Sequence, residues 1–167
     1  MRPTAGPLLR RARFEDWPGI ARLLRDLDEL HAGLAPQYFR SAPRAEADWP
    51  RLLADPTAAV FVAAGSSQAD GSATDGPIGL LSIRVYDTPA DPTMVPRRRA
   101  HIETLVVETG HRRRGIGRRL LGQAADWARA QGAVELVLTT WTGNQAADAF
   151  YERLGYRVLS RVLHAPL

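Results

Sequence analysis

The stretch from residue 101 to residue 121, HIETLVVETGHRRRGIGRRLL, most constrains what this chain can fold into. Ile102 to Val107 has the length and the β-branched enrichment of a strand, and Thr109-Gly110 ends it. From Ile116 onward the apolar residues recur at helical spacing. We therefore expect a strand, a basic loop that contains Gly115 and Gly117, and then the N-terminus of a helix.

A junction of this kind favours an anion, most often a phosphate. The first backbone N–H groups of a helix have no partner within it, and the helix dipole puts positive charge at the same end. Gly115 and Gly117 let the backbone approach a ligand where a Cβ would stand in the way. The alternative is a solvated basic loop, which leaves the two glycines unexplained because Gly does not help a helix begin. We interpret the loop as a phosphate or pyrophosphate cradle surrounded by five arginines: Arg112, Arg113, Arg114, Arg118 and Arg119.

Two familiar phosphate-binding motifs do not fit this loop. The Walker loop requires a lysine, and the chain contains none. The dinucleotide motif GxGxxG would need a third glycine where Leu120 stands. That motif also expects an acidic residue about 20 residues further on, and Glu135 leaves this second alternative weakly open.

The composition is that of an ordinary globular protein, with 45% hydrophobic and 24% charged residues in a chain of 167. We expect one domain over residues 8–167 after a flexible tail at 1–7. The chain has no cysteine, which excludes disulfides, thiolate metal sites and a cysteine nucleophile, and its four histidines are widely spaced, so we expect no metal. There is no membrane-length apolar run and no signal-peptide pattern, which predicts a cytoplasmic protein.

The basic residues raise the question of nucleic acid, because the net charge is +4. All 22 basic residues are arginine, and they cluster only at 97–99 and 112–119. The 18 acidic residues nearly balance them. Nucleic-acid binding is therefore the weaker interpretation.

The remaining segments predict a mixed α/β sheet. We expect helices from Asp16 (as N-cap, with Pro18 in the first turn), over 45–54 (short or kinked at Pro50), over 116–131, and from Asn144 to Gly155. The strand at 135–140 should lie parallel to 101–107 through a right-handed crossover. The earlier strands, joined by loops that include a polar hairpin at 66–76, should form an antiparallel meander. The expected strands are 8–13, 58–64, 78–86, 101–107, 135–140 and 156–163.

Two segments together resemble the GCN5-related N-acetyltransferases, the GNAT family. The pyrophosphate motif of that family, Q/R-x-x-G-x-G/A, is matched by Arg112, Gly115 and Gly117. A late pattern, N-x-x-A-x-x-F-Y-x-x-x-G-F/Y, is matched by Asn144, Ala147, Phe150, Tyr151, Gly155 and Tyr156.

The resemblance implies the GNAT-type fold, with strands 1–4 antiparallel, strands 4 and 5 parallel and splayed, and helices on the faces of the sheet. It implies acetyl-CoA as co-substrate, whose pantetheine arm would lie along one strand. Backbone groups from Arg112 to Gly117 would hold the pyrophosphate, with Arg114 and Arg118 near the 3′-phosphate. The full set of implied cofactor residues is Leu105, Val106, Val107, Arg112, Arg113, Arg114, Gly115, Ile116, Gly117, Arg118, Asn144 and Tyr151.

Acetyl transfer to an amine requires a base, a donor for the developing oxyanion, and an acid for the departing thiolate. By the same resemblance, Glu103 is the leading base, with His101 or a water relay as alternatives. The backbone N–H of Val107 is the expected oxyanion donor. Tyr151, whose phenol is neutral at pH 7, is the expected acid.

The acceptor is expected to be a small-molecule or peptidic amine, and the sequence does not choose among amine classes. Aromatic residues within 31–39, 86–96 and at Trp49 and Trp141 could line its site. The acidic residues Asp26, Asp28, Glu29 and Asp87 could attract a cation. A homodimer is compatible with the sequence, and no membrane partner is expected. Two other functions stay open: an acyl-CoA-binding sensor without catalysis, and an arginine-rich nucleic-acid binder.

Overall fold

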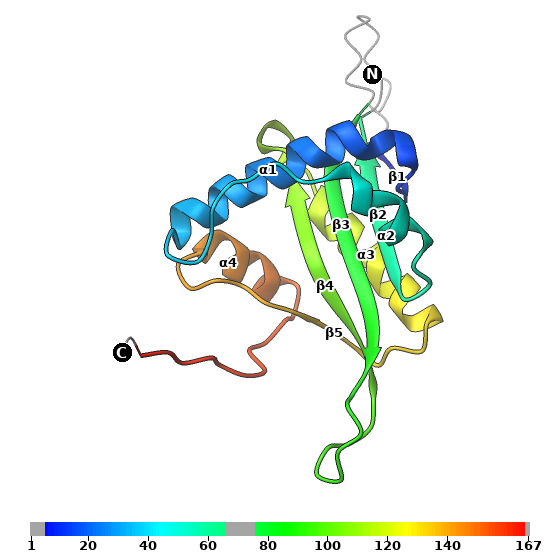
Figure 1. The fold of residues 1–167 in the computed structure, drawn as a ribbon, viewed down its shortest axis with the longest axis vertical. Helices are drawn as coiled ribbons and strands as arrows, with labels where there is room; N and C mark the ends of the chain where they lie inside the picture. The colour runs from blue at the N-terminus through cyan, green and yellow to red at the C-terminus, as the bar shows by residue number, and fades with distance from the viewer. Residues whose placement is uncertain (1–5, 66–75, 166–167) are drawn as a thin grey trace, which may run out of the picture.

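The computed structural model describes residues 6–65 and 76–165, and five strands form one sheet in the order β1-β2-β3-β4-β5 (Figure 1). Neighbouring strands from β1 to β4 are antiparallel, and β4 and β5 are parallel. This confirms the predicted mixed sheet; the hairpin expected at 66–76 lies almost wholly outside the described residues. The strands are β1 Leu8–Arg11, β2 Ala58–Ala64, β3 Pro77–Asp87, β4 Arg98–Val107 and β5 Glu135–Leu138.

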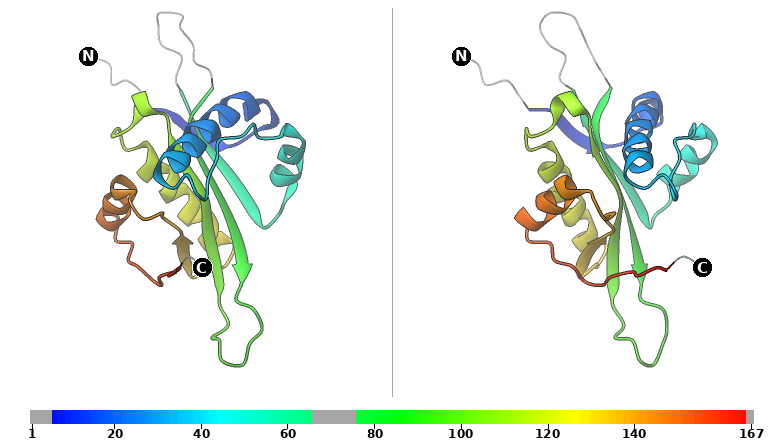
Figure 2. Two further views of the ribbon diagram at one scale, coloured as in Figure 1. Left: turned by 60° about the vertical axis from the view of Figure 1, so that its left-hand side comes forward. Right: turned by 90° about the vertical axis from the view of Figure 1, so that its left-hand side faces the viewer.

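Helices cover both faces of the sheet, α1 and α2 on one face and α3 and α4 on the other (Figure 2). On the first face Ile20 and Leu23 of α1 pack with Trp49 of α2 against β2 and β3. On the second face Ile116 and Leu120 of α3 pack against all three central strands. These apolar faces follow the helical spacing seen in the sequence. The helices are α1 Trp17–Leu34, α2 Trp49–Ala54, α3 Ile116–Ala130 and α4 Gln145–Arg153, with 3-10 turns at Phe14–Asp16, Glu46–Asp48 and Thr109–His111.

The first two helices begin near where the sequence predicted, but the predicted side-chain cap by Asp16 is absent. Pro18 and Pro50 each lie in the first turn of a helix, where the missing N–H of proline costs nothing. Asp16 occupies the N-cap position of α1, but its side chain does not cap the helix. Its carboxylate instead accepts two hydrogen bonds from Arg10, at 2.6 and 2.8 Å, and one from the backbone N–H of Arg13.

The parallel strands β4 and β5 are paired over only part of their length. The pairing runs from Arg99 opposite Glu135 to Ile102 opposite Leu138. Beyond Ile102, β4 continues to Val107, whereas β5 ends at Leu138 and the chain after it leads away toward α4 (Figure 1). The predicted splay is therefore present, and it leaves the 103–107 edge of β4 open on the side of β5.

A β-bulge interrupts β4 at the point where this splay begins. Ser82 of β3 pairs with Thr104, but the next residue of β3, Ile83, pairs with Ile102, so Glu103 is the extra residue. As a result Ala100 and Ile102 face the α3 core upstream of the bulge, and Leu105 and Val107 face it downstream.

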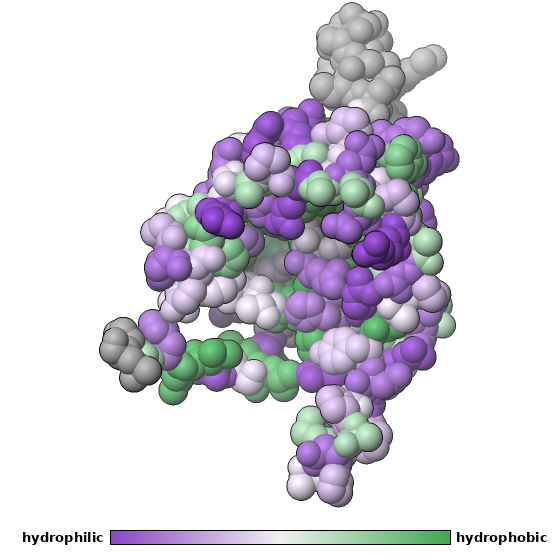
Figure 3. All heavy atoms as spheres, in the orientation of Figure 1, coloured by the Kyte–Doolittle hydropathy of each residue, from purple (hydrophilic) through white to green (hydrophobic). Residues whose placement is uncertain are grey.

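The strand predicted at 156–163 does not form, which corrects the sequence interpretation. A glycine with φ of 87° at Gly155 ends α4, and the N–H of Tyr156 bonds back to Tyr151. The chain then runs away from β5, so it has no neighbouring strand with which to pair. Figure 3 shows an open gap between this apolar segment and the body of the molecule. Four of its large apolar side chains are exposed: Val158, Leu159, Val162 and Leu163.

Candidate active site

The basic loop between β4 and α3 leads into the first turn of α3, whose first backbone N–H groups have no partner within the helix. Gly115 is the N-cap of α3 with φ of 77°, and no side chain caps the helix there. Arg113, two residues earlier, also has a positive φ of 60°. Left-handed residues that alternate with ordinary ones turn successive N–H groups toward a common point, which suits an anion. The loop therefore has the backbone shape expected from the sequence.

The two glycines of this loop meet different requirements. Gly115 adopts a left-handed conformation that strains other residues. A Cβ on Gly117 would lie 3.3 Å from Cζ of Phe150, so this glycine lets α4 approach the first turn of α3. The sequence predicted that both glycines allow the backbone to approach a ligand. The packing against Phe150 could not be read from their spacing.

Glu108 fixes the start of the loop, and sequence reasoning missed it. Its Oε1 lies 3.1 Å from Nη2 of Arg22 on α1, and its Oε2 lies 2.7 Å from Nδ1 of His111. Arg112 is held as well, because its Nε donates a hydrogen bond of 2.9 Å to the carbonyl oxygen of Val107. These contacts tie the loop to the first helix and to the end of β4.

The open edge of β4 carries backbone donors that lead toward this loop. Glu108 donates its N–H to the carbonyl oxygen of Ile78 in β3, at 2.9 Å. Since hydrogen-bonded and non-bonded pairs alternate along an antiparallel ladder, Val106 also bonds toward β3. The N–H groups of Leu105 and Val107 consequently face the open side, where β5 has ended.

A cleft of about 750 Å³ lies between α1 and the α1 side of β4, and we call it the α1–β4 cleft. Both candidate bases, His101 and Glu103, line it together with Thr104. The 86–96 loop, which was expected to contribute, does not. The aromatic lining comes from α1, the α1–α2 connection, α2 and the segment after β5: Trp17, His31, Tyr38, Phe39, Trp49 and Trp141.

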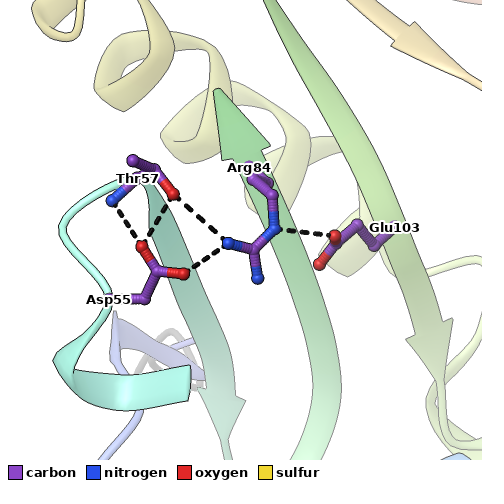
Figure 4. Close-up of polar contacts among 4 residues, drawn as sticks. All are labelled: Asp55, Thr57, Arg84 and Glu103. Carbon is purple, nitrogen blue, oxygen red and sulfur yellow. Dashed lines mark hydrogen bonds and ion pairs between the residues drawn. The ribbon is translucent and has the colours of Figure 1, made fainter. Parts of the chain in front are cut away.

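Glu103 is part of a polar network that the sequence did not reveal (Figure 4). Nε of Arg84 on β3 donates a hydrogen bond of 3.1 Å to its Oε1. The same guanidinium bonds Asp55 after α2 and Thr57, the latter at 3.2 Å. Bonds from the Thr57 hydroxyl and from Arg84 lower the pKa of Asp55 to about 2. Arg84 of β3 therefore holds the carboxylate of Glu103, and the connection between α2 and β2 anchors Arg84 in turn.

Tyr151 lies on α4, and it is not among the residues that line the α1–β4 cleft. Its ring packs edge-on between Phe150 and Tyr156, with centroid distances of 5.1 and 5.4 Å. Burial raises the pKa of Tyr151 to about 12, and the charge of Tyr156 adds to the effect. The phenol is therefore neutral at pH 7 and available as a hydrogen-bond donor.

Asn144 begins α4 as the sequence predicted. Its side-chain oxygen accepts a hydrogen bond of 3.2 Å from the N–H of Ala147. This leaves the amide NH₂ of Asn144 directed away from the cap, and it is the part of the side chain that can donate to a ligand.

The charged residues predicted to attract the acceptor are mostly elsewhere. Of the four acidic residues proposed, only Asp28 lines the α1–β4 cleft. The arginines at 97–99 are paired with carboxylates, since Arg97 and Arg99 lie 3.5 and 2.8 Å from Glu135. Within residues 6–65 and 76–165, no carboxylate lies within 4.0 Å of the loop arginines Arg112, Arg113, Arg114, Arg118 and Arg119.

The described ranges contain neither a metal-binding cluster nor a membrane-spanning helix. Over residues 6–65 and 76–165, His, Asp and Glu side chains nowhere gather in a group of three or more that could hold a metal ion. In that same part of the chain, no helix combines the length and the apolarity needed to span a membrane.

Comparison with known proteins bears on the site as a whole. The chain is 30% identical over 98 residues to N-acetyltransferase family 8 member 3 of Rattus norvegicus. The matched region covers 54% of this chain and 41% of the relative. It is 44% identical over 59 residues to streptothricin acetyltransferase of Streptomyces lavendulae, which covers 35% and 31%. The chain thus spans less than half the length of either relative.

The likeness in fold extends over nearly the whole chain. A solved structure of a mutant BH1408 protein from Bacillus halodurans matches with a TM-score of 0.87 at 25% identity, over 96% of this chain and 99% of that one. The sequence profile described as Acetyltransferase (GNAT) family matches residues 20–156, a range that includes the open edge of β4, the basic loop, α4 and all of the lining of the α1–β4 cleft except Trp17. The chain therefore belongs to the GNAT acetyltransferase family.

Proposed function

We propose that this protein is an N-acetyltransferase that moves the acetyl group of acetyl-CoA to an amine by direct attack within a ternary complex. The observation that carries the proposal is the open edge of β4 beyond Ile102, which runs directly into the uncapped N-terminus of α3. An extended arm with amide groups suits the first, and a pyrophosphate suits the second. Bound acetyl-CoA supplies an acetyl group activated as a thioester.

The chain's own groups divide the binding between them. The N–H groups of Leu105 and Val107 face the arm, and the backbone from Arg112 to Gly117 faces the pyrophosphate. Arg114 and Arg118, both exposed, supply charge for the outer phosphate. Asn144 donates its amide beside the arm.

The chemistry removes two protons from the acceptor ammonium and supplies one to the departing sulfur. Glu103 takes the first proton, and the neutral amine then bonds to the acetyl carbon. The nitrogen loses its second proton to water as the tetrahedral intermediate breaks down. The N–H of Val107 stabilises the negative charge that develops on the acetyl oxygen. As the carbon–sulfur bond breaks and its electron pair goes to sulfur, Tyr151 donates its proton there. The products are an acetamide and free CoA.

His101 is the alternative base, either directly or through a water molecule. It lines the same cleft as Glu103, and no ion pair in the described residues involves it. The pairing of Glu103 with Arg84 is the specific observation that favours this alternative, because one oxygen of the carboxylate is already engaged by a guanidinium.

The proposal is tested by combining a binding assay with a turnover assay. Acetyl-CoA at about 100 times its Kd should stabilise the protein by roughly 2.7 kcal/mol, seen as a rise in Tm. Release of CoA thiol should then depend on an added amine. Stabilisation without thiol release from any amine would support the acyl-CoA sensor instead. DNA binding that falls steeply with salt and is unaffected by CoA would support the nucleic-acid binder.

A further inference from the structure

We propose that the α1–β4 cleft takes an amine with a single positive charge and a flat apolar body, and that it discriminates against polycations. The inference rests on the proposed function, because it names the acceptor class of that same site. It follows from how the carboxylates of the cleft are paired and from where its aromatic rings lie.

The carboxylates that line the cleft are already paired with guanidinium groups. Asp28 and Glu103 are the two carboxylates that line the cleft along the described chain. Asp28 accepts two hydrogen bonds from Arg44, at 2.9 and 2.5 Å. Glu103 accepts one hydrogen bond from Arg84, at 3.1 Å. Each carboxylate thus already has a guanidinium partner, and Arg40 adds a further positive charge to the lining.

A polycation would therefore meet an unfavourable field in this cleft. Its second and third ammonium groups would lose water without finding a free carboxylate, and an uncompensated charge is costly to desolvate. The reacting ammonium loses its proton during the reaction, so its positive charge does not stay desolvated in the cleft. The charge pattern consequently favours an acceptor with one amine.

Aromatic rings form much of the wall of the cleft opposite β4. The rings of His31 and Phe39 lie 5.0 Å apart, and the ring of Phe39 meets that of Trp141 edge-on at 4.7 Å. Tyr38 lies 5.2 Å from Trp141. Aromatic rings at these separations form a surface on which a flat apolar group packs well, and they also attract a single cation.

The arrangement of these parts sets how the acceptor would lie. His101 and Glu103 line the β4 wall, whereas Phe39 and Trp141 come from the connection after α1 and from the segment after β5. An acceptor with its amine toward β4 would place its body among the rings. The volume of about 750 Å³ is in the usual range for one small molecule.

The experiment compares amines that differ in charge and shape. We would measure kcat/KM by CoA thiol release for 2-phenylethylamine, tryptamine, spermidine, kanamycin and a short peptide with a free N-terminus. The two aromatic monoamines should exceed the others by about tenfold or more. A preference for spermidine, kanamycin or the peptide would overturn the proposal.

Binding without turnover separates this proposal from the proposed function. The same amines would be titrated calorimetrically into the protein in the presence of CoA. Absence of thiol release from every amine contradicts the transferase function, while the order of affinities still tests the cleft. Tighter binding of a polycation than of tryptamine would contradict the acceptor class even in an active enzyme.

A charge variant gives a sharper test. Arg44 is half exposed, and Arg44→Gln frees the carboxylate of Asp28 without removing it from the cleft. The preference for tryptamine over spermidine should then fall by about fivefold to tenfold. Arg129→Gln is the matched control, since Arg129 pairs with Asp126 on the exposed side of α3. An unchanged preference in Arg44→Gln would overturn the charge argument.

An aromatic variant tests the role of the rings independently. Trp141→Leu should lower kcat/KM for tryptamine by about tenfold while leaving that for spermidine within about twofold. Phe14→Ala is the control, because Phe14 is an exposed aromatic residue outside the cleft. Equal losses for both amines in Trp141→Leu would mean that the ring acts only on the fold, and the stacking argument would fail.

Discussion

Arg84 holds Glu103 from the neighbouring strand, with a hydrogen bond of 3.1 Å from Nε to Oε1. The other end of the same guanidinium is anchored by Asp55, so the candidate base is fixed in position rather than free to swing. Burial is partial at both residues, which keeps the pair in contact with solvent. Because this hydrogen bond positions the carboxylate, a change at Arg84 should also affect Glu103.

Glu103→Gln should lower kcat/KM by about a hundredfold, because it removes a general base while keeping the size of the side chain. The measurement is steady-state thiol release across pH with His101 intact. Glu46→Gln, an exposed glutamate outside the cleft, is the control. Near wild-type activity in Glu103→Gln would assign the base to His101 or to a water relay.

Arg84→Gln should lower kcat/KM by a smaller factor, about tenfold, by loosening the position of Glu103. If Arg84 acts through Glu103, the double variant should be no worse than Glu103→Gln alone. A double-mutant cycle in kcat/KM measures this. Fully additive losses would show that Arg84 contributes separately, for example through its bond to Asp55.

Tyr151→Phe should lower kcat by about tenfold to a hundredfold and change the affinity for acetyl-CoA much less. The reason is that the phenol is needed as a proton donor when the thiolate leaves, whereas the ring packing with Phe150 survives the substitution. Single-turnover rates and calorimetric titration of acetyl-CoA separate the two effects. A loss confined to affinity would make Tyr151 a packing residue.

The same tyrosine should make the fold sensitive to alkali. Burial raises the pKa of Tyr151 from 10.0 to about 12, so the folded state holds this proton more tightly than the unfolded chain. The contribution of this proton to the free energy of unfolding is fully present below pH 10. As the pH rises to about 12 that contribution is lost, and the free energy of unfolding falls by roughly 2–3 kcal/mol.

Urea unfolding between pH 9 and pH 12 checks this expectation. Tyr151→Phe should flatten the fall in the free energy of unfolding, though not abolish it, because burial also raises the pKa of Tyr156. Tyr86→Phe, which alters an exposed tyrosine, is the matched control. An identical slope in Tyr151→Phe and wild type would contradict the raised pKa.

Two glycines of α3 should respond in opposite directions to alanine. Gly122 has no atom within 4 Å of a built Cβ, so Gly122→Ala should stabilise the protein by about 0.5–1 kcal/mol through helix propensity. The Cβ introduced by Gly117→Ala would lie 3.3 Å from the ring of Phe150, and this substitution should destabilise the protein by about 1 kcal/mol. Chemical denaturation of both variants tests this, and equal stabilisation would mean that α4 need not approach so closely.

Elements with a clear period were predictable from the sequence. The face of α3 that begins with Ile116 and Leu120 and the strand that ends at Val107 both follow local spacing, which is set by backbone geometry. The segment 156–163 shows the limit of this reasoning. Its apolar and β-branched residues have strand character, but a strand also requires a neighbour, and that depends on where α4 releases the chain.

The sequence predicted which residues belong to the candidate site better than it predicted the ion pairs between them. Glu103 and His101 do share a cleft, as their spacing on one strand suggested. The pairing of Glu103 with Arg84 depends on the register of β3 and β4 after a bulge, and no local pattern specifies that register. Asp28 illustrates the same point, since its partner Arg44 lies in an irregular connection.

The bulge at Glu103 divides β4 into two halves whose side-chain alternation is out of phase. The upstream half carries His101, which lines the α1–β4 cleft, and the downstream half carries Leu105 and Val107, whose N–H groups face the open edge of the strand. Because the extra residue takes up the change of phase, side chains of the upstream half can vary without shifting the backbone donors of the downstream half. Under the proposed function, one strand can thereby keep a constant co-substrate while its second substrate diverges.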